Sequence, residues 1–171
     1  MVGALLGKTI TEIHESDLEG VTKIGPYAFS DCTSLITAEI PESVISIGEE
    51  AFYNCSSLNS INLPEGVKSI GYGAFEGCDS IISIVIPDSV TFIGKSTFSS
   101  CGGLTSVVIP NSVTIIGELA FNWCTSLPSV VIPDSVTSIG EWAFYVCASL
   151  TSVTIGDGVT NIGENAFRGC I

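Results

Sequence analysis

Apolar and polar positions repeat along this chain with a fixed step of 23 residues. Two apolar columns are complete. They are Phe29, Phe52, Phe75, Phe98, Phe121, Phe144 and Phe167, and Cys32, Cys55, Cys78, Cys101, Cys124, Cys147 and Cys170. A period of about 20 to 50 residues is typical of solenoids, propellers and arrays, and this one is too short for a propeller blade or a paired-helix repeat. The pattern therefore predicts a solenoid with one coil per repeat.

Within one repeat, the spacing of apolar residues predicts two extended pieces and a turn segment. In the segment LTSVVI at 104–109, apolar inward positions alternate with outward ones, which predicts a short strand. Pro110 follows and ends the strand, because proline donates no hydrogen bond to a sheet. The segment VTSIG at 136–140 predicts a second strand, and its glycine suits a corner with positive φ. The segment EWAFYVC at 141–147 fits a helical turn or two facing the core.

One coil cannot bury its apolar residues alone, so successive coils must stack. We expect a β-rich repeat solenoid, right-handed, with a parallel sheet on one face, short second strands and short helical turns. The inward set in one repeat is Val44, Ile47, Ala51, Phe52, Cys55, Leu58, Ile61 and Leu63. Residues 1–20 keep only fragments of the pattern and are expected to form an N-terminal cap, a degenerate first coil. Residues 21–171 are expected to form the solenoid, about seven units with the last one incomplete.

The composition excludes several classes of partner. Five Lys and Arg against 18 Asp and Glu give a net charge of −13, which disfavours nucleic acid and anionic lipid and favours cationic partners. No apolar run reaches the roughly 18 residues of a membrane span, and no signal peptide is visible. The cysteines are expected to be buried free thiols, because reduced cysteine packs as a small apolar residue. We expect no metal and no cofactor.

Catalysis is not supported by the sequence. The only histidine, His14, lies in the irregular start of the chain and is expected to be solvated. No serine has a recurring general base beside it, as nucleophilic catalysis requires. We therefore expect a protein that is not an enzyme.

The pattern LxxVxIPxSVxxIGxxAFxxC, nearly complete at 104–124 and again at 127–147, resembles the BspA-type branch of leucine-rich repeats. The resemblance covers about 150 residues. It departs from the commoner leucine-rich pattern, because the asparagine that caps the strand there is absent and proline stands nearby. The resemblance implies a bacterial or protist surface or secreted protein that adheres to proteins of a host or neighbouring cell.

Three sets of positions are candidates for function. On the outer face of the first strands, hydroxyls beside valines form a flat array that could accept a protein: Ser83, Val85, Ser106, Val108, Ser129 and Val131. Bulky residues replace small or polar ones in two neighbouring repeats and are expected to form a patch: Leu119, Trp123, Trp142, Tyr145 and Val146. Both sets also have structural explanations, since small residues suit crowded strands and rings can pack over a corner. The third set, a column of acidic residues, is expected to be a solvated face.

These observations predict a non-catalytic, adhesion-type protein-binding leucine-rich repeat module, part of a surface or secreted protein. The alternative is a structural spacer or self-assembling repeat segment of a larger protein. The incomplete last unit, which ends at Cys170 and Ile171, leaves an apolar layer uncovered. Self-association through this uncapped C-terminal end is therefore a further hypothesis.

Overall fold

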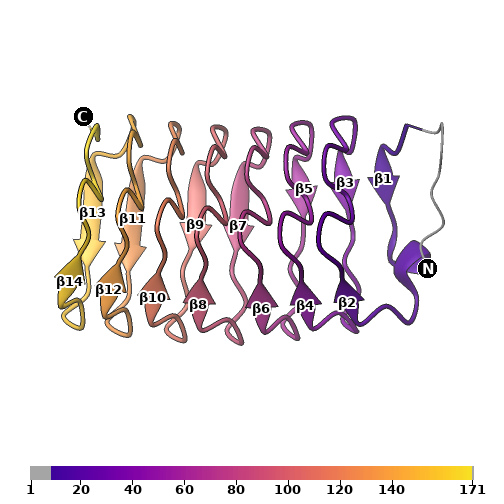
Figure 1. The fold of residues 1–171 in the computed structure, drawn as a ribbon, viewed down its shortest axis with the longest axis horizontal. Coiled ribbons are helices and arrows are strands. Elements are labelled where there is room, and N and C mark those ends of the chain that lie inside the picture. The colour runs from indigo at the N-terminus through magenta and orange to yellow at the C-terminus, as the bar shows by residue number, and fades with distance from the viewer. Residues whose placement is uncertain (1–8, 171) are drawn as a thin grey trace.

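The computed structural model describes residues 9–170, which form a stack of coils with almost no helix (Figure 1). Each coil contributes one strand to a first-strand wall and one to a second-strand wall. The first-strand wall contains β1 (Glu12–Ile13), β3 (Thr37–Ala38), β5 (Ser60–Ile61), β7 (Ser83–Val85), β9 (Ser106–Val108), β11 (Ser129–Ile132) and β13 (Ser152–Ile155). The second-strand wall contains β2 (Lys23–Ile24), β4 (Ser46–Ile47), β6 (Ser69–Ile70), β8 (Phe92–Ile93), β10 (Ile115–Ile116), β12 (Ser138–Ile139) and β14 (Asn161–Ile162). The predicted parallel β-solenoid of about seven turns is confirmed.

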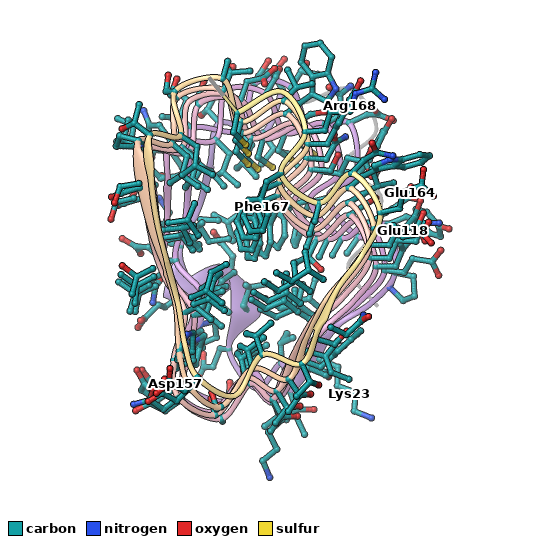
Figure 2. The ribbon with its side chains drawn as sticks, turned by 90° about the vertical axis from the view of Figure 1, so that its left-hand side faces the viewer. Lys23, Glu118, Asp157, Glu164, Phe167 and Arg168 are labelled. Carbon is teal, nitrogen blue, oxygen red and sulfur yellow. The ribbon has the colours of Figure 1, made fainter. Side chains whose placement is uncertain are left out.

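Equivalent residues of successive repeats lie directly above one another. Ser129 pairs with Ser152 in a parallel ladder, and Ile116 pairs with Ile139, both at the step of the sequence period. The phenylalanine rings form one continuous stack, with neighbouring ring centroids 5.1–5.6 Å apart. Viewed along the stack, Phe167 points into the middle of the coil (Figure 2). The sequence period therefore sets the register of the coils.

The predicted inward residues form one core that runs the length of the stack. In the repeat that begins at Val44, six of the eight are buried, whereas Ile61 and Leu63 are half-buried and pack against the core. At the start of the chain, β1 pairs with β3, and the 3-10 helix η1 (Glu15–Leu18) follows β1. The expected cap, residues 1–20, lies partly outside the described residues, and its boundary stays a prediction.

The glycine that follows each second strand has a different role from the one predicted. These glycines do not have positive φ. They are needed because the backbones of neighbouring coils touch at this column. A Cβ atom on Gly140 would lie 2.5 Å from Glu118 N and 2.5 Å from Gly117 C, closer than any side chain can approach. The prediction of a positive-φ corner is wrong, and the reason for glycine is close contact between coils.

The segment at 141–147 forms hydrogen-bonded turns, and no helix is present there. The N–H groups of Ala143, Tyr145 and Cys147 each donate to the carbonyl three residues earlier, at 3.3, 3.1 and 3.4 Å. A regular helix is prevented because two residues of the segment, Trp142 and Val146, have φ values of 54° and 55°. The same two positions of each repeat have positive φ along the whole stack.

The sheets are interrupted at two places along the stack. The first lies between β5 and β7 and between β6 and β8. Thr97 stands there in a column that is otherwise alanine, and it is buried, with its Oγ1 donating to Gly94 O at 3.0 Å. Gly94 is accordingly farther from the preceding coil than its column mates, with Ile70 O 3.8 Å from its Cβ position. The larger side chain thus loosens the stack at this coil.

The second interruption lies between β9 and β11. Pro128 occupies a position whose N–H donates to the preceding coil elsewhere: Thr105 N donates to Ile82 O at 2.8 Å, and Thr151 N donates to Pro128 O at 3.0 Å. Proline has no N–H, so it cannot continue this ladder. The first-strand wall therefore consists of three separate sheets.

Candidate functional site

The two sets of predicted binding residues lie on different sides of the solenoid, one on the first-strand wall and the other on the turn segments. In Figure 2 the first-strand wall descends on the left towards Asp157, while Glu164 and Arg168 project from the turn segments on the right. A ligand bound to one side therefore leaves the other side free.

The first-strand wall exposes a line of valines. Val85, Val108 and Val131 are 60%, 51% and 62% exposed, and Val85 and Val108 are paired in register. We call these three residues and the serines beside them, Ser83, Ser106 and Ser129, the valine face. At the gap opposite Pro128, a shallow hollow of about 330 Å³ is lined by residues 105–109 and 129–131. The sequence contains a signal for this gap, because Pro128 is the only proline in its column.

The second set lies on the turn segments, at the positions where φ is positive. Leu119, Trp123, Trp142 and Val146 have φ values of 57°, 59°, 54° and 55°. The backbone there is held by hydrogen bonds to the next coil, such as Trp123 N to Tyr145 O at 2.8 Å. Equivalent positions in other coils carry residues that tolerate this conformation, including Gly73, Gly77, Asn54, Asn165 and Gly169. A bulky residue in the left-handed region costs about 1–2 kcal/mol.

Four of the five predicted residues surround one hollow of about 260 Å³. Leu119, Trp123, Trp142 and Tyr145 line it, whereas Val146 does not. Trp123 and Trp142 are 50% and 40% exposed. The lining also includes three polar residues that the sequence reasoning missed, Asn122, Asn165 and Arg168. We call this site, with its seven lining residues, the aromatic hollow.

The missed residues belong to the same columns as the predicted ones. Asn122, Tyr145 and Arg168 are spaced by 23 residues, and Asn165 follows Trp142 at the same step. Because the coils stack in register, members of one column become neighbours on the surface. The repeat period was therefore the signal that could have placed all seven residues together.

The polar groups of the aromatic hollow are only partly satisfied by the protein. Asn165 Nδ2 donates to Glu164 Oε1 at 3.1 Å, and Asn122 Nδ2 lies 3.5 Å from Ser99 Oγ. Asn122 Oδ1 is buried and has no hydrogen-bond partner. Within residues 9–170, the guanidinium of Arg168 makes no salt bridge, although the chain has 18 acidic residues. The hollow thus combines partly exposed aromatic side chains with the guanidinium of Arg168.

The acidic residues lie on the surface as expected. Several of them pair with nearby groups, and Lys95 Nζ lies 3.0 Å from Glu118 Oε1. This hydrogen bond raises the pKa of Lys95, but an exposed pair of this kind contributes little to stability. His14 is exposed and lies 3.5 Å from Glu12 and 3.6 Å from Glu39.

The cysteine column lies in the core. Its seven thiols are free, buried in the middle of the stack and half-buried at Cys32 and Cys170. Each thiol from Cys55 onward donates to a phenylalanine carbonyl of the preceding coil, as Cys101 Sγ does to Phe75 O at 3.2 Å. Burial raises the pKa of Cys55 to about 12 and that of Cys101 well above its usual value. Because the thiolate is the reactive form, these cysteines act as packing residues.

Comparison with known proteins identifies relatives of the whole stack. A family model described as a BspA type leucine rich repeat region, in six copies, matches residues 22–121 and 91–171. The leucine-rich repeat protein of T. pallidum is 37% identical, with a TM-score of 0.88, over 95% of this chain and 78% of that one. A leucine-rich repeat protein from Bacteroides ovatus is 27% identical, with a TM-score of 0.53, over 88% of this chain and 56% of that one. No curated protein matches the chain. No helix in the described residues is long and apolar enough to cross a membrane.

Proposed function

We propose that this chain, which belongs to the BspA-type leucine-rich repeat family, is a non-catalytic module that binds another protein through its valine face. The observation that carries the proposal is the line of valines on β7, β9 and β11, each more than half exposed. Solvent-exposed apolar residues in a continuous line are typical of interaction surfaces, whereas scattered ones are not. Protein binding is also the general role of leucine-rich repeat domains.

Burial of the valine face by a partner contributes favourable free energy to binding. Completing the burial of one half-exposed valine contributes about 1 kcal/mol, so the three together contribute about 3 kcal/mol. The serines beside them can exchange hydrogen bonds with a partner, as the polar rim of an interface does. The net charge of −13 favours a partner with a basic surface, because it speeds the encounter of opposite charges.

Resemblance to the family supports placing the module in a surface or secreted protein with an adhesive role. The valine face needs neither metal nor cofactor to act in this way.

The proposal is tested by replacing the three valines with threonine. Threonine is close in shape to valine and occurs naturally in this column as Thr154, so the strands should be preserved. The immobilised chain is exposed to extracellular and cell-surface proteins, and retained proteins are identified, purified and titrated. We expect the triple Val85, Val108 and Val131→Thr variant to bind at least about tenfold more weakly, which corresponds to about 1.4 kcal/mol.

A matched control changes an exposed isoleucine on the second-strand wall. Ile115→Thr alters a residue that is 40% exposed and lies outside the valine face. The control should bind as the unchanged chain does. Equal binding by the triple variant and the unchanged chain contradicts the proposal.

The alternative, a structural or self-assembling segment, rests on the last described coil. Ile155 and Ile162 are 42% and 49% exposed there. Concentration-dependent association in analytical ultracentrifugation, together with no retained partner, favours this alternative.

A further inference from the structure

The aromatic hollow contains both tryptophans of the chain, at positions where the backbone has positive φ in every coil. Trp123 and Trp142 have φ values of 59° and 54°, where other coils place Gly77 and Asn165 in the same columns. The stack therefore forms without aromatic residues at these positions. Because positive φ is common to these positions along the stack, the two tryptophans are distinguished by their exposed rings and not by their backbone.

Aromatic stacking does not account for these rings. Within the part of the chain that the structure describes, aromatic stacking is confined to the phenylalanine column in the core. Trp123 and Trp142 do not stack on each other or on Tyr145, and they remain 50% and 40% exposed. Their indole faces are consequently available to a ligand.

The polar lining defines the chemistry of that ligand. Asn122 and Asn165 present amide groups, Tyr145 a hydroxyl and Arg168 a guanidinium, all around the same small space. An amide and a hydroxyl can each donate and accept, whereas the guanidinium only donates. This set matches a ring that carries several hydroxyls and an anionic or strongly accepting group.

We propose that the aromatic hollow binds one sugar ring of a glycan, with preference for a pyranose that carries a carboxylate. The C–H groups on the face of a pyranose pack against the electron-rich face of an indole. The hydroxyls at its rim exchange hydrogen bonds with the amides and with Tyr145. The carboxylate accepts from Arg168, which can bind it in a bidentate manner.

The size of the hollow agrees with this occupant. Its volume of about 260 Å³ is below the roughly 300–1,000 Å³ of pockets that enclose drug-sized ligands. A single sugar ring fits this space, and the rest of a glycan can extend into solvent. Arg168 is the only charged residue in the lining, and the neighbouring carboxylate of Glu164 accepts a hydrogen bond from Asn165 Nδ2 at 3.1 Å. Salt at physiological concentration screens the distant acidic residues.

Sugar binding goes beyond the protein binding proposed for the valine face. The aromatic hollow lies on the turn segments, away from that face, so either proposal can fail without the other. Sugar binding can be tested by intrinsic fluorescence, because Trp123 and Trp142 are the only tryptophans in the chain. The probes are the methyl glycosides of glucuronate and of glucose, which share a ring and an anomeric group and differ only at C6, a carboxylate in one and a hydroxymethyl group in the other. We expect a saturable change in tryptophan emission with both sugars in the millimolar range, and tighter binding of glucuronate.

Three variants assign the contacts. Trp142→Asn introduces the residue that its column carries at Asn165, and Trp123 remains as the reporter. This variant should bind both sugars at least about tenfold more weakly, a change of about 1.4 kcal/mol. Arg168→Gln should weaken glucuronate to the level of methyl glucopyranoside and leave the neutral sugar unchanged. Val108→Thr, on the valine face, should bind both sugars normally.

Two outcomes overturn the proposal. One is the absence of a saturable change with either sugar while circular dichroism shows the folded stack. The other is saturation by basic or acidic peptides with no response to sugars, which assigns the aromatic hollow to a protein partner. Equal affinity for the two sugars overturns the preference for a carboxylate and the role of Arg168.

Discussion

Replacement of Gly140 by alanine tests the contact between coils. The added Cβ would lie 2.5 Å from two backbone atoms of the preceding coil, Glu118 N and Gly117 C, neither of which can rotate away. The coils must separate, which also weakens the hydrogen bond from Gly140 N to Ile116 O, now 2.8 Å. Overpacking costs about 1–3 kcal/mol and the hydrogen bond about 1 kcal/mol, so we expect a loss of about 2–4 kcal/mol.

The same substitution at Gly25 is a matched control. Gly25 belongs to the same column, its φ is not positive, and no atom lies within 4 Å of its Cβ position. Gly25→Ala should therefore be neutral or stabilise by about 0.4–1 kcal/mol, because alanine restricts the unfolded chain. Gly94→Ala should fall between them, since its nearest neighbour is Thr97 Oγ1 at 3.2 Å.

Urea unfolding followed by circular dichroism gives the free energy of unfolding of all three variants. In thermal unfolding, a loss of 2–4 kcal/mol corresponds to a fall in Tm of roughly 4–16 °C for a chain of this size. Equal effects of Gly25→Ala and Gly140→Ala would show that loss of glycine itself, and not contact between coils, determines stability. That result would refute the reasoning.

Three further predictions concern the core and the loosened coil. At pH 8, a thiol reagent should label Cys32 and Cys170 well before the five buried cysteines, as read by mass spectrometry; uniform labelling contradicts this. Burial raises the thiol pKa from its usual 9.0 to about 12 at Cys55 and Cys147, so the contribution of these thiols to stability should be constant below pH 9 and fall between pH 9 and 12. The Gly94 amide, for which no hydrogen bond is found in the described residues, should exchange at least about tenfold faster than that of Gly117, which donates to Ile93 O at 2.8 Å. Equal exchange rates by NMR would contradict the loosened coil.

The sequence period was sufficient to predict the register, because a residue that recurs every 23 positions must stack on its equivalent if coils form. The phenylalanine column and the parallel pairing of Ser129 with Ser152 follow from that period alone. The positive-φ positions could not be predicted. Their columns contain residues as different as Tyr27, Glu50 and Leu119, so no glycine signal marks them. Hydrogen bonds to the next coil impose that conformation, and these appear only in three dimensions.

The binding surfaces were partly predictable from the repeat period, because residues of one column become neighbours on the surface. Trp123 and Trp142 were visible because they are the only tryptophans of the sequence and lie in neighbouring repeats, whereas Arg168 was not identified although it stands 23 residues after Tyr145. Thr97 and Pro128 each depart from the residues usual in their columns, close to an interruption of the sheets. Their effect on the distance between coils depends on tertiary packing, which the sequence does not show. Periodicity therefore predicts the scaffold better than it predicts the sites.

The central claim is that equivalent residues of successive repeats touch along one axis. A crystal structure of the chain tests it most directly. We expect the rings of Phe52, Phe75, Phe98, Phe121 and Phe144 in a single buried stack, with neighbouring centroids 5.1–5.6 Å apart. Rings displaced from one another, or coils shifted so that phenylalanine packs against a different column, would contradict the account.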